Sequence, residues 1–252
     1  MSLKTYTIQL FPPRFRLPII FYLHKLRGTL DREISYLESL ITSNKRAIDI
    51  GANKGLYSYA LSKFCSAVEA FEPQPWSAET ITKSERPNIN VHRVALSNCK
   101  GTQTLHIPLV KGEIYPALAS IENLGQKKHK DIEVSIERLD DYNFQDVSLI
   151  KIDVEGHESK VIEGAKRTIL REKPILLIEI EQRHLGDKPI ETAFKEITEL
   201  GYEGSFLSNG KFFPLSDFSY DKYQQPYLED DANSIFRHKN RGKVNNFIFK
   251  SV

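Results

Sequence analysis

The loop 153–158, Asp-Val-Glu-Gly-His-Glu, carries more ionisable groups than a strand-to-helix turn usually does. A carboxylate or an imidazole in such a loop can remove a proton from a bound substrate. His157 suits this role by its ordinary pKa of ~6.5, and Glu155 suits it if burial raises its pKa. Both are therefore predicted catalytic residues. The alternative, that such side chains only favour the N-terminus of the next helix, stays open for His157 and is the role expected for Glu158.

A second stretch with chemical potential is 46–55, in which apolar residues surround Asp49 and glycines follow at 51 and 55. This pattern predicts a buried strand that ends in a sharp turn and leads into a helix. Such a turn brings backbone N–H groups close to a ligand. Glu72 follows the next predicted strand, about 20 residues past the turn, where an acid can bind the hydroxyls of a ribose.

The glycine spacing narrows the choice of ligand. A nicotinamide fingerprint needs a middle glycine, so that the backbone can approach a pyrophosphate, and 51–55 lacks it. The stretch therefore favours a ligand with a ribose and no pyrophosphate. S-adenosylmethionine fits, because its ribose suits Glu72 and its cationic methionine part suits carboxylates at strand ends, such as Asp49 and Asp153. Structural capping of the neighbouring turns is the alternative for these two acids.

Four motifs, met in this order along residues 31–181, resemble those of the FkbM-type S-adenosylmethionine-dependent methyltransferases. They are 49–55, 71–73, 94–97 and 150–158. The resemblance implies methylation of a hydroxyl group, on a sugar, a glycan or a glycosylated metabolite, and it puts the adenine beside Ala95. The predicted cofactor-binding residues are Asp49, Gly51, Ala52, Asn53, Gly55, Glu72, Ala95 and Asp153.

A further cluster of polar residues follows the predicted strand 174–180. Glu179, Glu181 and His184 could line the acceptor pocket, and we predict Glu179 and His184 as substrate-binding residues. Such residues could also hold a divalent metal, but no spacing in the chain is typical of a metal site. We therefore predict no metal and a transfer reaction that needs none. The other histidines are expected to be structural or solvent-facing, and Trp76 either shields the adenine or packs.

The composition limits the broad class of protein. At 252 residues and 40% hydrophobic content, the chain is long enough for one well-filled domain. The net charge of +2 supports no nucleic-acid binding, and two cysteines cannot build a disulfide framework. The apolar run 17–26 is too short to span a bilayer, which takes ~20 residues. We expect a cytoplasmic protein, and its oligomeric state stays open.

Alternating strand and helix patterns predict the α/β class. We expect a Rossmann-like, doubly wound, mostly parallel seven-stranded methyltransferase sheet with helices on both faces and added β-strands. Its predicted strands are 47–50, 67–71, 89–96, 147–153, 174–180 and 246–250, and the added ones are 102–110, 117–121 and 134–139. The predicted helices are 31–41, 56–64, 77–86 with Ser77 as N-cap, 158–170 and 190–200. Residues 127–130 are expected to form a solvated loop.

The N-terminal residues 1–30 are predicted to be an extension that packs over the catalytic core, 31–252. Its prolines, at 12, 13 and 18, argue against a long amphipathic helix there. Two other functions remain as alternatives for the whole chain. One is a nicotinamide-dependent oxidoreductase, which the missing glycine disfavours. The other is a non-catalytic module that has kept a Rossmann-like fold.

Overall fold

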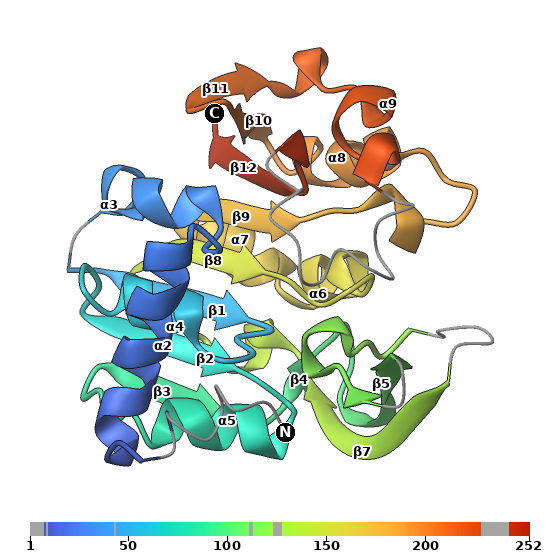
Figure 1. The fold of residues 1–252 in the computed structure, drawn as a ribbon. Coiled ribbons are helices and arrows are strands. Elements are labelled where there is room, and N and C mark those ends of the chain that lie inside the picture. The colour runs from blue at the N-terminus through green and yellow to red at the C-terminus, as the bar shows by residue number, and fades with distance from the viewer. Residues whose placement is uncertain (1–7, 9, 43, 111–112, 123–127, 228–241) are drawn as a thin grey trace.

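The computed structural model describes residues 8, 10–42, 44–110, 113–122, 128–227 and 242–252. A large sheet of eight strands crosses the molecule in the order β11-β10-β12-β9-β8-β1-β2-β3 (Figure 1). The parallel strands are β1 (Arg46–Ile50), β2 (Ala67–Phe71), β3 (Ile89–His92), β8 (Val147–Ile152) and β9 (Ile175–Glu179). The antiparallel strands are β10 (Tyr202–Ser208), β11 (Lys211–Pro214) and β12 (Asn246–Ser251).

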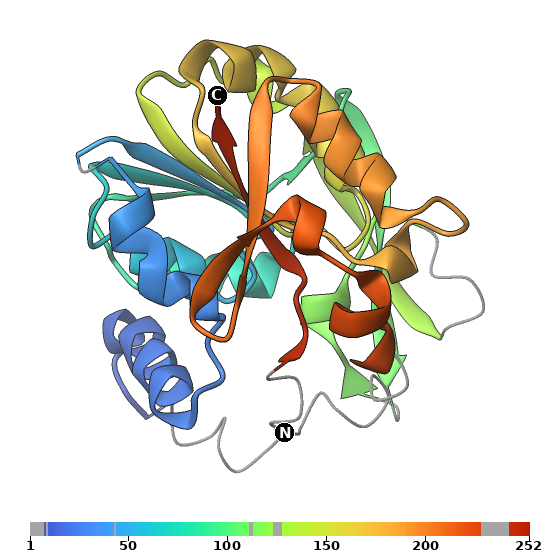
Figure 2. The same ribbon diagram turned by 90° about the horizontal axis from the view of Figure 1, so that it is seen from above.

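Helices cover both faces of this sheet (Figure 2). One face carries α2 (Pro13–Arg27), α3 (Leu37–Leu40), α4 (Leu56–Leu61) and α5 (Pro75–Thr82). The other carries α6 (Glu158–Gly164), α7 (Lys166–Glu172) and α8 (Ile190–Thr198). Successive residues of each parallel strand point to opposite faces, so Ala47 packs with the first group and Ile48 with the second. The predicted α/β class and Rossmann-like sheet are confirmed. The eighth strand is β11, which extends the sheet through a hairpin with β10.

A second, four-stranded sheet lies beyond the carboxyl ends of β1 and β2 (Figure 1). Its order is β4-β7-β5-β6, with β4 (Ala95–Leu96), β5 (Gly101–Val110), β6 (Glu113–Ile114) and β7 (His129–Glu137). The remaining short elements are α9 (Tyr220–Tyr223) and the 3₁₀ turns η1 (Arg32–Tyr36), η2 (Pro116–Leu118), η3 (Leu139–Asp141), η4 (Gln182–His184), η5 (Leu215–Asp217) and η6 (Gln225–Tyr227). None of the helices in the described ranges is long and apolar enough to cross a membrane.

The prediction of one strand over 89–96 was wrong. β3 ends at His92 in the large sheet, and Ala95 begins β4, which pairs with β7 in the second sheet. The alternating pattern shows that both segments are extended, but it carries no information about the sheet to which each belongs. The predicted strand 117–121 is also absent. Pro116 begins the turn η2 there, and a single bridge joins Ser120 to His106.

The predicted helix 158–170 is two helices, because Asp140, from a more distant part of the chain, caps the second one. Both carboxylate oxygens of Asp140 accept hydrogen bonds from the backbone N–H groups of Arg167 and Thr168, at 2.9 and 2.8 Å. These N–H groups are thereby taken out of a continuous helix, and Ala165 becomes the N-cap of α7.

Other helix boundaries differ from the predicted ones. Helix α5 begins at Pro75, a favoured first position, so that Ser77 lies inside the helix and is not its N-cap. Residues 31–41 form the turn η1 and the short helix α3, and α4 ends at Leu61, before residue 64. Residues 129 and 130, expected in a loop, begin β7.

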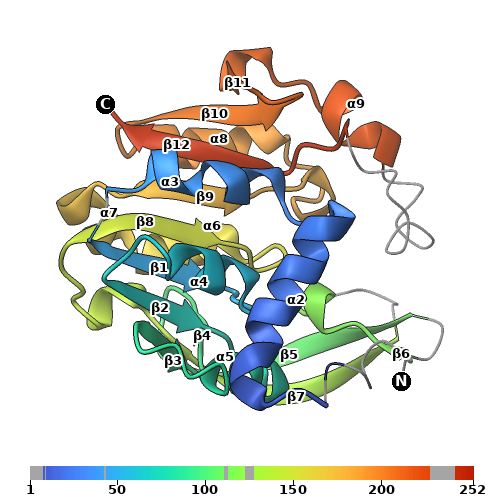
Figure 3. The same ribbon diagram turned by 60° about the vertical axis from the view of Figure 1, so that its left-hand side comes forward.

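The N-terminal prolines do not prevent a helix. Helix α2 has 15 residues, starts with Pro13 at its first position and continues through Pro18. It packs across α4 (Figure 3). Leu17 and Phe21 are buried there, in one apolar cluster with Tyr59 and Leu61 of α4. Burial of these side chains compensates for the backbone hydrogen bond that Pro18 cannot make.

Candidate functional site

The cleft of the molecule lies where β1, β2 and β8 end, as expected for ligand sites of open α/β sheets. It consists of two hollows that share Gly51, Asn53 and Asp153. The empty space between the lining atoms, part of it open to solvent, is about 580 Å³ in the larger hollow and about 360 Å³ in the smaller one. The predicted residues that line the larger hollow are Gly51, Asn53, Glu72, Ala95, Asp153, Glu155 and His157. Those that line the smaller one are Asp49, Gly51, Ala52, Asn53 and Asp153.

Three predicted site residues line neither hollow. Gly55 is the N-cap of α4 with φ of 79°, and a side chain there would collide with Ile81. It permits the turn and close helix packing. Glu179 accepts a hydrogen bond of 2.7 Å from the side-chain nitrogen of Asn245. Nε2 of His184 lies 3.3 Å from a carboxylate oxygen of Glu155, so His184 adjoins the cleft through that residue.

Glu72 comes directly after β2 and is 2% exposed. Its two carboxylate oxygens accept hydrogen bonds from the backbone N–H groups of Asn53 and Gln74, at 2.7 and 2.8 Å. Burial raises the pKa of Glu72 to about 7, although these two bonds act in the opposite direction. The carboxylate is thus held in a fixed position in the wall of the larger hollow, with accepting capacity left for a ligand's hydroxyl groups.

Asp49 and Lys151 meet at the smaller hollow. Asp49 lies in the buried strand β1 and accepts a hydrogen bond of 2.5 Å from the hydroxyl of Ser58 on α4. Burial raises its pKa to about 6. Lys151, on the adjacent strand β8, is only 1% exposed, and its Nζ lies 3.7 Å from a carboxylate oxygen of Asp153. Burial lowers the pKa of Lys151, but the nearby acids, led by Asp153 and Glu179, outweigh this effect and raise it.

Lys151 was missed by the sequence reasoning, although a signal for it exists. A single lysine between the apolar neighbours Ile150 and Ile152 of a buried strand must find carboxylates, because an unpaired buried charge is too costly. The structure supplies them from the ends of several strands. Lys151 therefore compensates the negative charge that Asp49 and Asp153 bring to the cleft.

The side-chain oxygens of Asn53 and Gln74 are buried in the walls of the cleft without a hydrogen-bond partner. Asn53 follows β1 and lines both hollows, and Gln74 follows β2 and lines the larger one. Because buried polar groups are normally paired, these two atoms mark places where a bound ligand would complete the hydrogen bonding.

Glu155 has the most unusual environment in the cleft. Its φ of 52° is in the left-handed region, which is strained for a residue with a side chain. Its carboxylate lies 3.3 Å from both Nη2 of Arg183 and Nε2 of His184. Burial, with a smaller contribution from Asp153, raises the pKa of Glu155 to about 8 against the opposing effect of Arg183.

His157 is buried and engaged at both ring nitrogens. Its Nε2 lies 2.9 Å from the hydroxyl of Ser97, and its Nδ1 lies 2.6 Å from a carboxylate oxygen of Glu122. Burial lowers the pKa of His157, although Glu122 acts in the opposite direction. Sequence reasoning missed both partners, which are 60 and 35 residues away along the chain.

An ionic network lies behind Glu155. Glu181 is contacted by Lys243 at 2.9 Å and by Nε of Arg183 at 2.5 Å. Burial raises its pKa, but Arg183 and Lys243 outweigh this and lower it to about 2, so Glu181 stays ionised. Burial, together with the nearby charge of Asp153, raises the pKa of Glu179 well above its ordinary value. The network fixes Arg183 beside Glu155.

Comparison with known proteins identifies the family. The methyltransferase FkbM domain model matches residues 49–204. The crystal structure of methyltransferase FkbM from Methylobacillus flagellatus KT is 14% identical with a TM-score of 0.52, covering 95% of this chain and 55% of that one. An rRNA methylase from Streptococcus thermophilus is 9% identical with a TM-score of 0.45, covering 87% of this chain and 94% of that one. A Streptococcus mutans protein in complex with SAH is 11% identical with a TM-score of 0.46, covering 88% of this chain and 99% of that one.

At such identities the likeness to the first structure shows a shared fold alone. This chain spans about half the length of that structure. No curated protein matches the chain at a significant level. The family match, in contrast, covers more than half of the 252 residues. The chain therefore belongs to the methyltransferase FkbM domain family, and it shares the fold of the methyltransferase FkbM structure.

Proposed function

We propose that this chain transfers a methyl group from S-adenosylmethionine to a hydroxyl group of a sugar, a glycan or a glycosylated metabolite, with Glu155 as the proton acceptor. The observation that carries this proposal is the environment of Glu155. This residue lines the larger hollow on a strained backbone, and the pKa of its carboxyl group is raised to about 8. A base with a pKa near the working pH is suited to proton removal.

The residues of the cleft fit the cofactor. Glu72 would hold the ribose hydroxyls, because its carboxylate is fixed by two backbone N–H groups at the wall of the larger hollow. Asp49 and Asp153 would hold the cationic amino group in the smaller hollow. The unpaired side-chain oxygens of Asn53 and Gln74 can accept further hydrogen bonds. Bound S-adenosylmethionine supplies a methyl group that its positively charged sulfur has already activated.

Glu155 is better placed as the base than His157, the other predicted candidate. Both nitrogens of His157 are already within hydrogen-bond distance of protein groups, so this ring cannot take a proton from an acceptor unless Ser97 moves. Glu155 keeps accepting capacity on its carboxylate, and Arg183 and His184 orient it from one side. Hydrogen bonds from Arg183 and His184 would also stabilise the ionised carboxylate of Glu155, which is the form that accepts the proton.

A transfer assay with a panel of sugars and glycosides, read out as S-adenosylhomocysteine release, tests the proposal. In Glu155→Gln the transfer rate should fall by ~10²–10⁴, while cofactor affinity stays nearly unchanged. The wild-type rate should rise as pH increases through about 8, since only ionised Glu155 is a base. Glu163→Gln, on the exposed surface of α6, is the matched control and should transfer normally.

Two results would contradict these assignments. Full activity of Glu155→Gln would remove Glu155 from the mechanism and return the search for the base to His157 and His184. Transfer to none of the hydroxyl compounds, by a protein that binds S-adenosylhomocysteine, would contradict the acceptor class and leave the methyltransferase assignment intact.

A further inference from the structure

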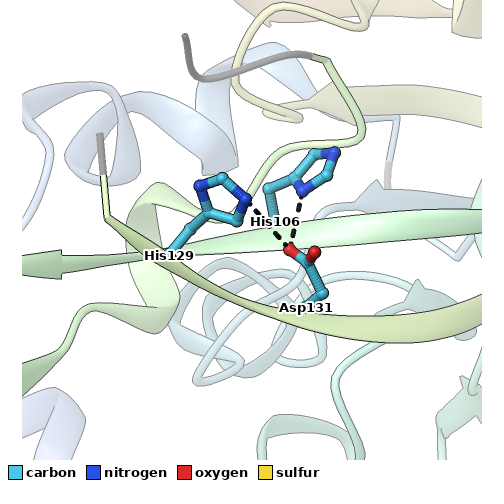
Figure 4. Close-up of side chains that lie close together, drawn as sticks. All are labelled: His106, His129 and Asp131. Atoms are coloured by element: carbon cyan, nitrogen blue, oxygen red, sulfur yellow. Dashed lines mark hydrogen bonds and ion pairs between the residues drawn. The ribbon is translucent and has the colours of Figure 1, made fainter. Parts of the chain in front are cut away.

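Two histidines and one aspartate come together on the second sheet (Figure 4), and none of them lines the cleft. His106 lies on β5, and His129 and Asp131 lie on β7. His106 is directly opposite Asp131 in the antiparallel register, and His129 precedes Asp131 by two residues. All three side chains therefore point to the same side of the pleated sheet.

The three side chains converge on one point. Nδ1 of His106 is 2.8 Å from a carboxylate oxygen of Asp131, and Nε2 of His129 is 3.4 Å from that same oxygen. One ligand atom from each residue lies within 4.8 Å of the other two. Two imidazole nitrogens and a carboxylate oxygen at such spacing suit a tetrahedral ion with ligand bonds of roughly 2.0–2.2 Å.

We propose that His106, His129 and Asp131 form a binding site for a divalent transition metal ion, with Zn²⁺ as the ion that this donor set fits best. Nitrogen ligands exclude a preference for Mg²⁺ or Ca²⁺, which select oxygen, and three protein ligands leave a fourth position for water. Each of the three side chains is partly exposed, which gives the ion access. None of them lines the cleft, so the site is separate from methyl transfer.

The site is connected to the wall of the cleft through the backbone. Leu105, on the opposite side of β5, lines the larger hollow. His106 exchanges two backbone hydrogen bonds with Ser120, and the hydroxyl of Ser120 donates to the backbone oxygen of Glu155 at 2.6 Å. A bound ion would cross-link β5 to β7 and so stiffen this wall. Its expected role is structural, and it should raise the melting temperature.

Calorimetric titration of ZnCl₂ into chelator-treated, untagged full-length protein at pH 7.5 tests the site. We expect one ion per chain. His106→Ala, His129→Ala and Asp131→Asn should each weaken binding by at least the roughly 10–100-fold that is typical when even an outer-shell partner of a metal site is lost. Asp131→Asn is nearly isosteric on an exposed position, so it keeps the sheet intact while removing the charged ligand.

Two control variants exclude other zinc ligands. Cys99→Ser removes the exposed thiol, and His24→Ala removes a histidine of α2 that contacts Thr29. Both should bind Zn²⁺ as the wild type does, and the wild type should melt at a higher temperature with Zn²⁺ than without it. The proposal is overturned if the wild type does not bind, if Cys99→Ser or His24→Ala loses binding, or if all three ligand variants keep wild-type affinity.

Discussion

Burial sets the protonation of the carboxyl groups in the cleft one residue at a time. It raises the pKa of Asp49 to about 6, that of Glu72 to about 7 and that of Glu155 to about 8. Glu181 is also buried, yet Arg183 and Lys243 lower its pKa to about 2. The difference is the number of positive partners within reach, since burial alone disfavours the ionised form and a nearby cation restores it.

Glu72 allows a direct test of cofactor binding. Glu72→Ala removes hydrogen bonds to a charged group, which are each worth ~1.5–3 kcal/mol, so affinity for S-adenosylhomocysteine should fall roughly 10- to 100-fold. Calorimetry measures this loss. Glu69→Ala is the matched control, because Glu69 lies on β2 just before Glu72, pairs with Arg46 and His92, and lines neither hollow. Equal losses in the two variants would mean that Glu72 does not hold the ribose.

At the scale of elements, His157 joins segments that are distant along the chain. It connects the loop before α6 to Ser97 after β4 and to Glu122 beside the second sheet. Ser120 makes a parallel connection to the same loop through the backbone oxygen of Glu155. These bonds hold the second sheet against the large one at the cleft, so the imidazole has a clear structural role whatever its part in catalysis.

The pH dependence of stability reports this role. The folded-state pKa of His157 is lowered, so its stabilising contribution is present above the unfolded value of 6.5 and is lost as pH falls below it. His157→Gln should lose ~1–3 kcal/mol of unfolding free energy at pH 7.5 and less at pH 5. Urea denaturation at the two pH values measures the difference. A loss of the same size at both would show that His157 stabilises the fold without titrating.

The packing of helix α2 leads to a prediction about stability. Leu17 has no exposed surface, and Leu26, on the same helix, is 84% exposed. Leu17→Ala should lower the unfolding free energy by ~2–5 kcal/mol, because it opens a cavity between α2 and the core. Leu26→Ala should change it by less than ~0.5 kcal/mol. Chemical denaturation compares them, and a near-zero effect of Leu17→Ala would mean that α2 is not docked in solution.

For the whole molecule, ligand binding should raise the free energy of unfolding and therefore the melting temperature. A ligand at about one hundred times its Kd adds ~2.7 kcal/mol to the unfolding free energy, and each kcal/mol raises the Tm of a protein of this size by roughly 2–4 °C. S-adenosylhomocysteine should therefore raise the Tm by several degrees, while NAD and NADP should not. Thermal scans with each ligand decide this, and a shift with NAD alone would favour the oxidoreductase alternative.

Much of the fold could be predicted from local patterns in the sequence. The apolar run before Gly51 identifies β1 because a buried parallel strand must be apolar on both faces, and the glycine marks the turn that follows. Glu72 could be placed in the cleft for a related reason. Ends of parallel strands meet at one edge of a sheet, so the order of strands and helices alone brings Glu72 and Asp153 together.

Only the tertiary structure decided which of these groups are free to react. The sequence makes His157 look like a base, but Ser97 and Glu122 occupy both of its nitrogens from distant parts of the chain. The proposed metal site of His106, His129 and Asp131 depends on a strand register that no local pattern specifies. The physical reason is common to both cases. Propensity and periodicity act between near neighbours in the chain, whereas burial, pairing and pKa depend on side chains that packing brings in from far away.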